Sequence, residues 1–254
     1  MRFATVRTPR GLRLHVKGTG GYVDLADASG DASLSDINAL AAGGESALGA
    51  ARAASAQGGV ALAREDFAPV TPNPNRVLCL GVNYAEHAIE GGRYIAAEDA
   101  FDAILGYAVM NDGSAREWQR KATQWTPGKN FEGTMPIGPE LVTVDEVDVT
   151  DLAIRTTLNG EVMQDARTSM MIVTVAKAVE YFSGFTTLRP GDVIATGTPG
   201  GVGFARTPPV WLTPGDTIEV FIEGVGTISN TVVAEEGAPA DWPWQPLQVD
   251  TTNF

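Results

Sequence analysis

The sequence is poor in cysteine and has no long hydrophobic run, and both absences exclude whole classes of protein. Cys79 is the one cysteine among 254 residues, which excludes an internal disulfide framework and fits a reducing cytoplasm. No apolar run is long enough to span a bilayer. The opening residues, MRFATVRTPR, lack the continuous apolar core of a signal peptide. We therefore expect a cytoplasmic protein with no membrane partner.

Positive charge is also scarce. The chain has 18 lysines and arginines against 31 acidic residues, which gives a net charge of −13. Binding of nucleic acid needs a basic surface, so we expect no nucleic-acid partner. Because the chain is so acidic, we consider the few cationic side chains near a candidate site, such as Arg116 and Lys129, as candidate functional residues. The alternative is that the acidic excess serves solubility alone.

Length and composition allow a sizeable core. The 254 residues, 44% of them hydrophobic, suffice for one large domain or for one large and one small domain. The segment at 64–76, REDFAPVTPNPNR, is rich in proline and predicts a linker. We therefore predict a small N-terminal α/β domain at 1–70 and a catalytic domain at 71–254.

Local patterns predict the elements of both domains. Paired strands are expected at 2–7 and 12–16, followed by helices near 35–42 and 45–57. The apolar run at 77–80 predicts a buried strand, in which Cys79 would be a small core residue. Further predictions are a helix at 97–105 with Phe101 and Ile104 on its apolar face, a hairpin around Asn159-Gly160, a helix from Thr168-Ser169 to Phe182, a strand at 193–195 and a hairpin at 217–233.

The stretch at 106–129, GYAVMNDGSAREWQRKATQWTPGK, carries the most chemistry. It predicts a strand that ends near Asn111 and a helix capped just after it, on which Arg116 and Gln119 share one face. A carboxylate at the strand end, with these two residues and Lys129 beyond, suits a small anion held beside a metal ion. Alternatively, Asp112 is a simple helix N-cap.

Several motifs in this order resemble the fumarylacetoacetate hydrolase family. They are NDGSAREWQ followed by GK, GVNYAEHAIE at 81–90, TTLNGEVMQ at 156–164 and LRPGDVIATGTPGGVG at 188–203. The resemblance runs from about Asn75 to Val233. It implies a β-rich α+β fold, a mixed β-sandwich roll with a small N-terminal domain, which usually forms homodimers.

The resemblance also implies roles for particular residues. His87 and Glu90 would be a catalytic dyad on a lid and would share one side of a helical turn, although an isolated pair of this spacing is more often solvated surface. Lys129 would be a third catalytic residue, which stabilises developing charge. The remaining roles are metal ligand for Asp112 and substrate binding for Arg116, Gln119 and Thr198.

The reaction that the resemblance implies is metal-dependent cleavage of a carbon–carbon bond in a small 2,4-diketo acid, such as an acylpyruvate or a fumarylacetoacetate-like compound. The ion would be Mg²⁺ or Mn²⁺, with Ca²⁺ as a further candidate. The alternatives are a decarboxylase or tautomerase that acts on an oxaloacetate-like keto acid, and a non-catalytic family member. In the enzymatic cases the partner is a small anionic keto acid.

One part of the family pattern is missing. The family carries a strand with Glu-x-Glu, two further metal ligands, after the segment that holds His87. In this sequence Gly92 leads directly to Arg93, and no Glu-x-Glu stands nearby. Loss of two core strands would leave unpaired sheet edges. We therefore predict that a segment is missing from the sequence at the Gly92/Arg93 junction.

Overall fold

The computed structural model describes residues 1–80, 83, 86–89, 92–121 and 123–237, and for 86–89 it describes the backbone alone. One set of strands consists of β1 (Arg2–Thr8), β2 (Gly11–Gly18), β3 (Gly21–Asp24), β4 (Arg76–Cys79), β5 (Glu86–Ile89), β6 (Gly106–Met110), β7 (Ile137–Thr143) and β10 (Asp192–Ala195). A second set consists of β8 (Ala153–Leu158), β9 (Glu161–Arg167), β11 (Thr217–Ile222) and β12 (Gly226–Thr231). The α-helices are α1 (Leu25–Ser29), α2 (Ile37–Ala42), α3 (Gly44–Ser55), α4 (Arg116–Gln119), α5 (Thr126–Lys129) and α6 (Val175–Phe185). Short 3₁₀ turns include η3 (Ala97–Ala103), η6 (Thr168–Met170) and η7 (Gly203–Ala205).

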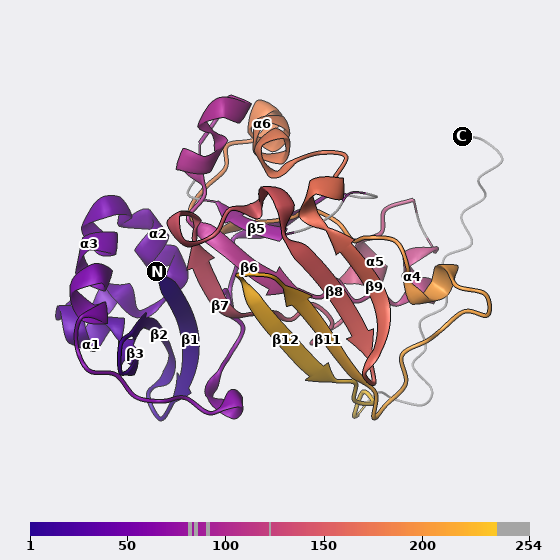
Figure 1. Ribbon diagram of the computed structural model, residues 1–254, viewed down its shortest axis with the longest axis horizontal. Coiled ribbons are helices and arrows are strands. Elements are labelled where there is room, and N and C mark those ends of the chain that lie inside the picture. Colours follow the sequence, from indigo (N-terminus) through magenta and orange to yellow (C-terminus); the bar gives the residue numbers. More distant parts are fainter. Residues whose placement is uncertain (81–82, 84–85, 90–91, 122, 238–254) are drawn as a thin grey trace.

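In the part of the chain that the structure describes, the strands form two sheets. The large sheet has the order β3-β2-β1-β7-β6-β5-β10-β4, and the small sheet has the order β12-β11-β8-β9. Helices α1 to α3 lie beside β1 to β3, and α6 lies apart from them, at the top of the view (Figure 1). This combination of mixed sheets and separate helices is the α+β fold that the sequence predicts.

Two hydrophobic cores support the sheets. One joins the N-terminal helices to β1, β2 and the inner face of β6 and β7, with Phe3, Leu14 and Leu141 fully buried. The other lies between α6, the large sheet and the small sheet. Because β1 pairs with β7, the large sheet runs without a break from the N-terminal strands into the rest of the chain. The domain boundary at residue 70 stays a prediction.

The hairpins follow directly from turn chemistry. Asn159 and Gly160 both have positive φ angles, of 52° and 84°, which a two-residue turn between right-twisted strands requires. The predicted hairpins at the N-terminus, at β8–β9 and at β11–β12 are all confirmed. No helix among the described residues is long and apolar enough to cross a membrane.

Some local predictions were wrong. The predicted cap at Thr168-Ser169 is wrong, because helix α6 begins at Val175, with Thr174 as its N-cap, and ends at Phe185. Thr168 is instead hydrogen-bonded to Leu152: its backbone N–H donates to the Leu152 carbonyl, and its hydroxyl oxygen accepts from the Leu152 N–H. Cys79 is exposed rather than a core residue, since β4 is the last strand of its sheet. Phe101 is 38% exposed, because η3 is a 3₁₀ turn whose side-chain period differs from that of an α-helix.

Three strands of the large sheet end at the same edge. Strand β10 is parallel to β4 and antiparallel to β5, and β5 is antiparallel to β6. Strands β4, β6 and β10 therefore all run in one direction. Their carboxyl ends, at Cys79, Met110 and Ala195, lie on the same side of the sheet, where these strands end. We call this side the carboxyl edge.

An ion pair between a buried carboxylate and a partly exposed guanidinium ties β10 to β4. The Asp192 side chain is 1% exposed, and its Oδ2 accepts from Arg76 Nη2 at 2.6 Å and from Nε at 3.0 Å. The same oxygen accepts from the backbone N–H of Arg189 at 2.8 Å. Removing the guanidinium would leave a buried carboxylate without its counter-charge, which is strongly destabilising.

We predict that Arg76→Met lowers the free energy of unfolding by about 3 kcal/mol, measured by urea denaturation. The matched control is Arg155→Met, which removes an ion pair to Asp165 whose partners are 49% and 54% exposed. Such a surface pair contributes about 0–1 kcal/mol. Equal effects of the two substitutions would contradict this account of the Arg76 pair.

Candidate functional site

Asp112 lies just beyond the end of β6, at the carboxyl edge. Its Oδ2 accepts a hydrogen bond from Lys129 Nζ at 2.5 Å, and the two side chains are 31% and 21% exposed. Its Oδ1 atom is buried and has no hydrogen-bond partner among the described residues. The N-cap of α4 is Ala115, and no side chain caps that helix. The expected cap is therefore absent, and the N-cap explanation of Asp112 is wrong.

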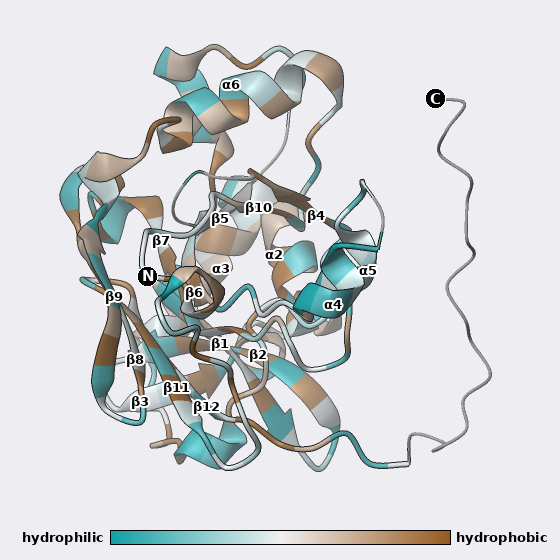
Figure 2. Cartoon of the chain, turned by 90° about the vertical axis from the view of Figure 1, so that its right-hand side faces the viewer, coloured by the Kyte–Doolittle hydropathy of each residue, from teal (hydrophilic) through white to brown (hydrophobic). Residues whose placement is uncertain are grey.

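Two short helices carry the cationic and amide groups of the site. On α4, Arg116 Nη1 donates to Gln119 Oε1 at 2.6 Å, which confirms that these two residues share one face. Lys129 is the last residue of α5, and the two helices lie side by side in both views (Figures 1 and 2). The backbone N–H of Ala115 donates to the carbonyl of Gly128 at 2.9 Å.

Gly128 allows the two helices to approach so closely. A Cβ atom at this position would lie 2.5 Å from the Gln119 Cβ and 2.6 Å from its Cα. Backbone that approaches a neighbour at this distance has room for no side chain. The glycine therefore sets the position of Lys129, the next residue, against Asp112.

The charges of these residues influence one another. Burial lowers the pKa of the Arg116 guanidinium, while the negative charge of Asp112 raises it. Although the residue is exposed, partial burial of the Cys79 thiol raises its pKa, the charge of Asp112 adds to that rise and the charge of Lys129 opposes it. We call Asp112, Arg116, Gln119 and Lys129 the polar cluster, with Cys79 beside it. These four predicted site residues are thus brought together.

Thr198 lies in the segment after β10, at the same edge of the sheet. It is exposed, and its Oγ1 accepts from Gln164 Nε2 at 2.9 Å. Gln164 also donates to the carbonyl of Pro199 at 2.7 Å, so a residue of β9 fixes this segment. No hydrogen bond joins Thr198 to the polar cluster within the described residues. Its role in binding substrate stays a prediction.

The expected catalytic dyad is only partly described. His87 belongs to β5, where it stands opposite Ile194 in the register. The prediction of a helical turn was wrong for residues 86–89, because this segment pairs with β10 as a strand. Glu90 lies outside the described residues. The proposed pairing of the two side chains stays a prediction.

The polar cluster supplies part of a site for a divalent metal ion. A cation would satisfy the buried, unpartnered Oδ1 of Asp112. Mg²⁺ commonly binds through one or two carboxylates, with water and substrate completing its shell. Among the described residues, no three His, Cys, Asp or Glu side chains form a group that could hold a metal. Asp112 therefore fits such an ion as a single oxygen ligand.

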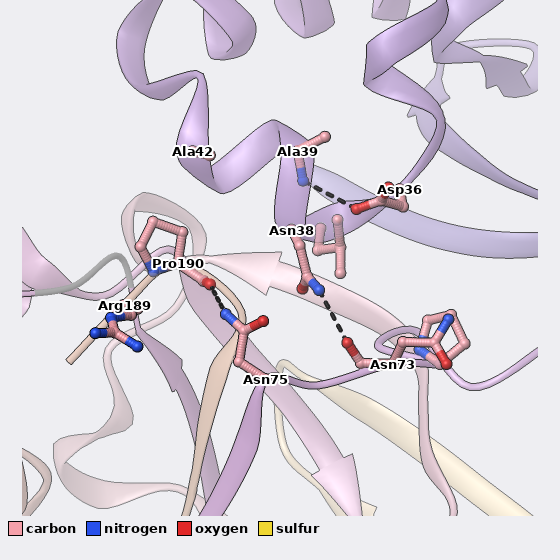
Figure 3. Close-up of a pocket in the computed structure, with 10 residues that line it drawn as sticks. Asp36, Asn38, Ala39, Ala42, Asn73, Asn75, Arg189 and Pro190 are labelled. Atoms are coloured by element: carbon pink, nitrogen blue, oxygen red, sulfur yellow. Dashed lines mark hydrogen bonds between the residues drawn. The ribbon is translucent and has the colours of Figure 1, made fainter.

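A large cavity lies elsewhere, at the opposite edge of the sheet. It has a volume of about 540 Å³ and lies between α2, the segment before β4 and the turn before β10. Figure 3 shows Asn38 and Asn75 donating across it to the carbonyls of Asn73 and Pro190. The side-chain amides of Asn38 and Asn75 thus hold together the segments that line the cavity. None of the predicted site residues whose side chains the structure describes lines it.

Comparison with known proteins identifies the group to which the chain is related. A model of the fumarylacetoacetate (FAA) hydrolase C-terminal domain matches residues 90–233, more than half of the chain. The chain belongs to the fumarylacetoacetate hydrolase family. The resemblance seen in the sequence motifs is thereby confirmed.

Relatives of known activity or structure include both isomerases and hydrolases. The mitochondrial oxaloacetate tautomerase FAHD2A of Homo sapiens is 34% identical, with 92% of each chain covered. A fumarylacetoacetate hydrolase from Exiguobacterium antarcticum has 27% identity and a TM-score of 0.78, covering 92% of this chain and 100% of that one. A maleylpyruvate hydrolase from Sphingobium sp. SYK-6, in complex with manganese(II) and pyruvate, has 26% identity and a TM-score of 0.73, covering 92% and 99%.

The human relative contains residues that this chain lacks. The alignment runs over 289 positions, more than the 254 residues of the whole chain. Since 92% of the chain is about 234 residues, about 55 aligned positions have no counterpart here. This total of unmatched positions supports the prediction that internal residues are missing. Its location at the Gly92/Arg93 junction stays a prediction.

Proposed function

We propose that this protein interconverts the keto and enol forms of oxaloacetate or a similar small keto acid. The observation that carries the proposal is the polar cluster, in which Lys129 and Arg116 flank one carboxylate at the carboxyl edge. The similarity to an oxaloacetate tautomerase over 92% of each chain supports this choice of substrate. The sequence motifs alone gave tautomerisation as the alternative to hydrolysis.

The cluster has the groups that this proton transfer requires. In the reaction a proton leaves C3 of the keto acid and the C2 oxygen gains one, so keto and enol forms contain the same atoms. Arg116 and Gln119 bind the substrate carboxylate, and the ammonium of Lys129 stabilises negative charge on the C2 oxygen. His87 is the candidate base for the C3 proton.

A divalent ion, when bound through Asp112, would polarise the keto oxygen and lower the energy of the enolate. Mg²⁺ and Mn²⁺ suit its carboxylate oxygen, and the maleylpyruvate hydrolase structure contains manganese. The protein's own part is to hold Asp112 with Lys129 and to keep Arg116 charged beside it.

Hydrolysis of a carbon–carbon bond in a 2,4-diketo acid is the second candidate. It is favoured by the likeness to maleylpyruvate hydrolase over nearly the whole of both chains. Both reactions pass through a similar enolate, so the residues of the polar cluster serve either one.

Product analysis distinguishes the two reactions. Oxaloacetate and an acylpyruvate are each incubated with the protein and Mn²⁺ or Mg²⁺, and the products are followed by proton NMR. Tautomerisation exchanges the C3 protons of oxaloacetate with solvent and leaves the acylpyruvate uncleaved. Release of pyruvate from the acylpyruvate, without faster exchange in oxaloacetate, would overturn the proposal in favour of hydrolysis.

We predict that Gly128→Ala weakens binding of pyruvate about tenfold or more, because the new methyl group pushes α5 and Lys129 away from α4. Binding is measured by calorimetric titration in the presence of Mn²⁺. The control is Gly184→Ala in α6, where an added Cβ has no atom within 4 Å. Unchanged pyruvate affinity in Gly128→Ala would show that the spacing of these helices does not govern the site.

A further inference from the structure

An aromatic ring lies against the arginine of the polar cluster. Phe204, in the 3₁₀ turn η7, faces Arg116 with 4.2 Å between its ring centroid and the guanidinium carbon. Arg120, one residue past α4, lies 5.6 Å from the same centroid. In Figure 1 the orange segment around residues 200–210 lies beside α4. A guanidinium within about 6 Å of a ring face is attracted by the ring's electrons.

The backbone holds Phe204 in this place. The carbonyl of Gly203 accepts from the N–H groups of Arg206 and Val210, at 3.2 and 3.0 Å. The Arg206 guanidinium donates to the carbonyl of Gly201 at 3.0 Å and to that of Met163 in β9 at 2.5 Å. A Cβ at Gly203 would lie 2.2 Å from the Val210 oxygen, so this turn closes tightly on itself. The backbone that carries the Phe204 ring is therefore held by contacts within the protein itself.

The contacts of Arg116 leave part of its guanidinium for a ligand. One N–H is used by Gln119, and one face is covered by Phe204. Within the described residues no other hydrogen bond of this side chain occurs. A planar guanidinium held by one edge and one face can present its remaining N–H groups as a pair, which matches the geometry of a carboxylate.

We propose that Phe204 is a positioning residue, which orients Arg116 to receive the substrate carboxylate. This inference rests on the proposed function, because it concerns the same site. Phe204 does not touch the reacting atoms, and it acts through Arg116. Its loss should therefore weaken substrate binding more than it slows the chemical step.

The test compares Phe204→Leu with Phe204→Tyr in pyruvate binding and in oxaloacetate tautomerisation, both with Mn²⁺ present. Leucine keeps an apolar side chain but lacks the ring face, whereas tyrosine keeps it. We expect Phe204→Leu to raise the Kd for pyruvate and the KM for oxaloacetate about fivefold, with kcat nearly unchanged. Phe204→Tyr should restore both values. Phe221→Leu, at a phenylalanine 40% exposed on β11, is the control for loss of a surface ring.

A second comparison tests whether the effect passes through Arg116. In an Arg116→Ala background, Phe204→Leu should add no further loss of pyruvate affinity. Independent, additive losses would overturn the inference, as would unchanged pyruvate binding in Phe204→Leu. Failure of the wild-type protein to bind pyruvate at all would count against the proposed function instead, which keeps the two failures apart.

Discussion

Lys129→Met is expected to lower the rate of oxaloacetate tautomerisation about 100-fold or more. The reason is that Lys129 Nζ lies 2.5 Å from Asp112 Oδ2. In the proposed site this ammonium group is the cation that stabilises the enolate oxygen. Loss of one donor to a developing oxyanion costs about 10²–10³ in rate in other enzymes. Methionine keeps the length and apolar stem of lysine, so the change removes mainly the charge. The rate is measured as the decay of enol absorbance.

The control for Lys129→Met is Lys177→Met on α6. Lys177 is 59% exposed and forms a surface pair with Glu180 at 2.7 Å. Its removal lowers the net charge by the same amount but lies outside the polar cluster, so the rate should stay within about twofold. Equal losses in both variants would show that overall charge, and not the position of Lys129, governs the rate.

Asp112→Asn is expected to weaken Mn²⁺ binding about tenfold or more. The carboxylate is the one metal ligand that the described part of the site supplies, and an amide oxygen is a much weaker ligand for a hard cation. Binding is followed by electron paramagnetic resonance of free Mn²⁺, a readout that does not depend on turnover. The substitution also leaves Lys129 without its ion-pair partner.

Asp165→Asn serves as the control for this change. Asp165 is 54% exposed, on β9, and pairs with Arg155. Its loss should leave the Mn²⁺ affinity as it is in the wild type. The same affinity in Asp112→Asn as in the wild type would remove Asp112 from the metal site.

The sequence predicted the fold well wherever a short pattern determines the geometry. Asn159-Gly160 encodes a turn with positive φ at both residues, and the alternating residues of β11 and β12 encode a hairpin. The start of α6 was missed because Thr168 makes hydrogen bonds to Leu152, which is distant in sequence. A capping residue cannot be distinguished from such a tertiary contact by local pattern alone.

In the candidate site, too, contacts between residues close in sequence were predicted, and contacts between distant residues were not. Arg116 and Gln119 were placed together by helical spacing, and the structure confirms their contact. The ion pair of Lys129 with Asp112 joins residues seventeen positions apart, and the sequence analysis did not predict it. Phe204 was missed altogether, because an aromatic residue in a glycine-rich loop carries no signal of the arginine it faces.

The predicted missing segment would have a direct consequence for the metal. The family pattern implies two further carboxylate ligands, and about 55 positions of the human relative have no counterpart in this chain. An intact mass well above 26.7 kDa would show that the protein contains residues beyond the sequence printed here. A mass of 26.7 kDa would leave Asp112 as a candidate ligand without the Glu-x-Glu residues that the family pattern implies.

The most direct test is the decay of the oxaloacetate enol in the presence of the protein. The enol form is diluted into buffer with Mn²⁺, and its ultraviolet absorbance is followed at increasing protein concentration. We predict that the rate of enol decay rises in proportion to the concentration of wild-type protein. With the double variant Arg116→Ala, Lys129→Met, the rate should equal that in buffer alone. Decay at the buffer rate with folded wild-type protein, or an equal rise with the double variant, would contradict an enolate-stabilising role for the polar cluster.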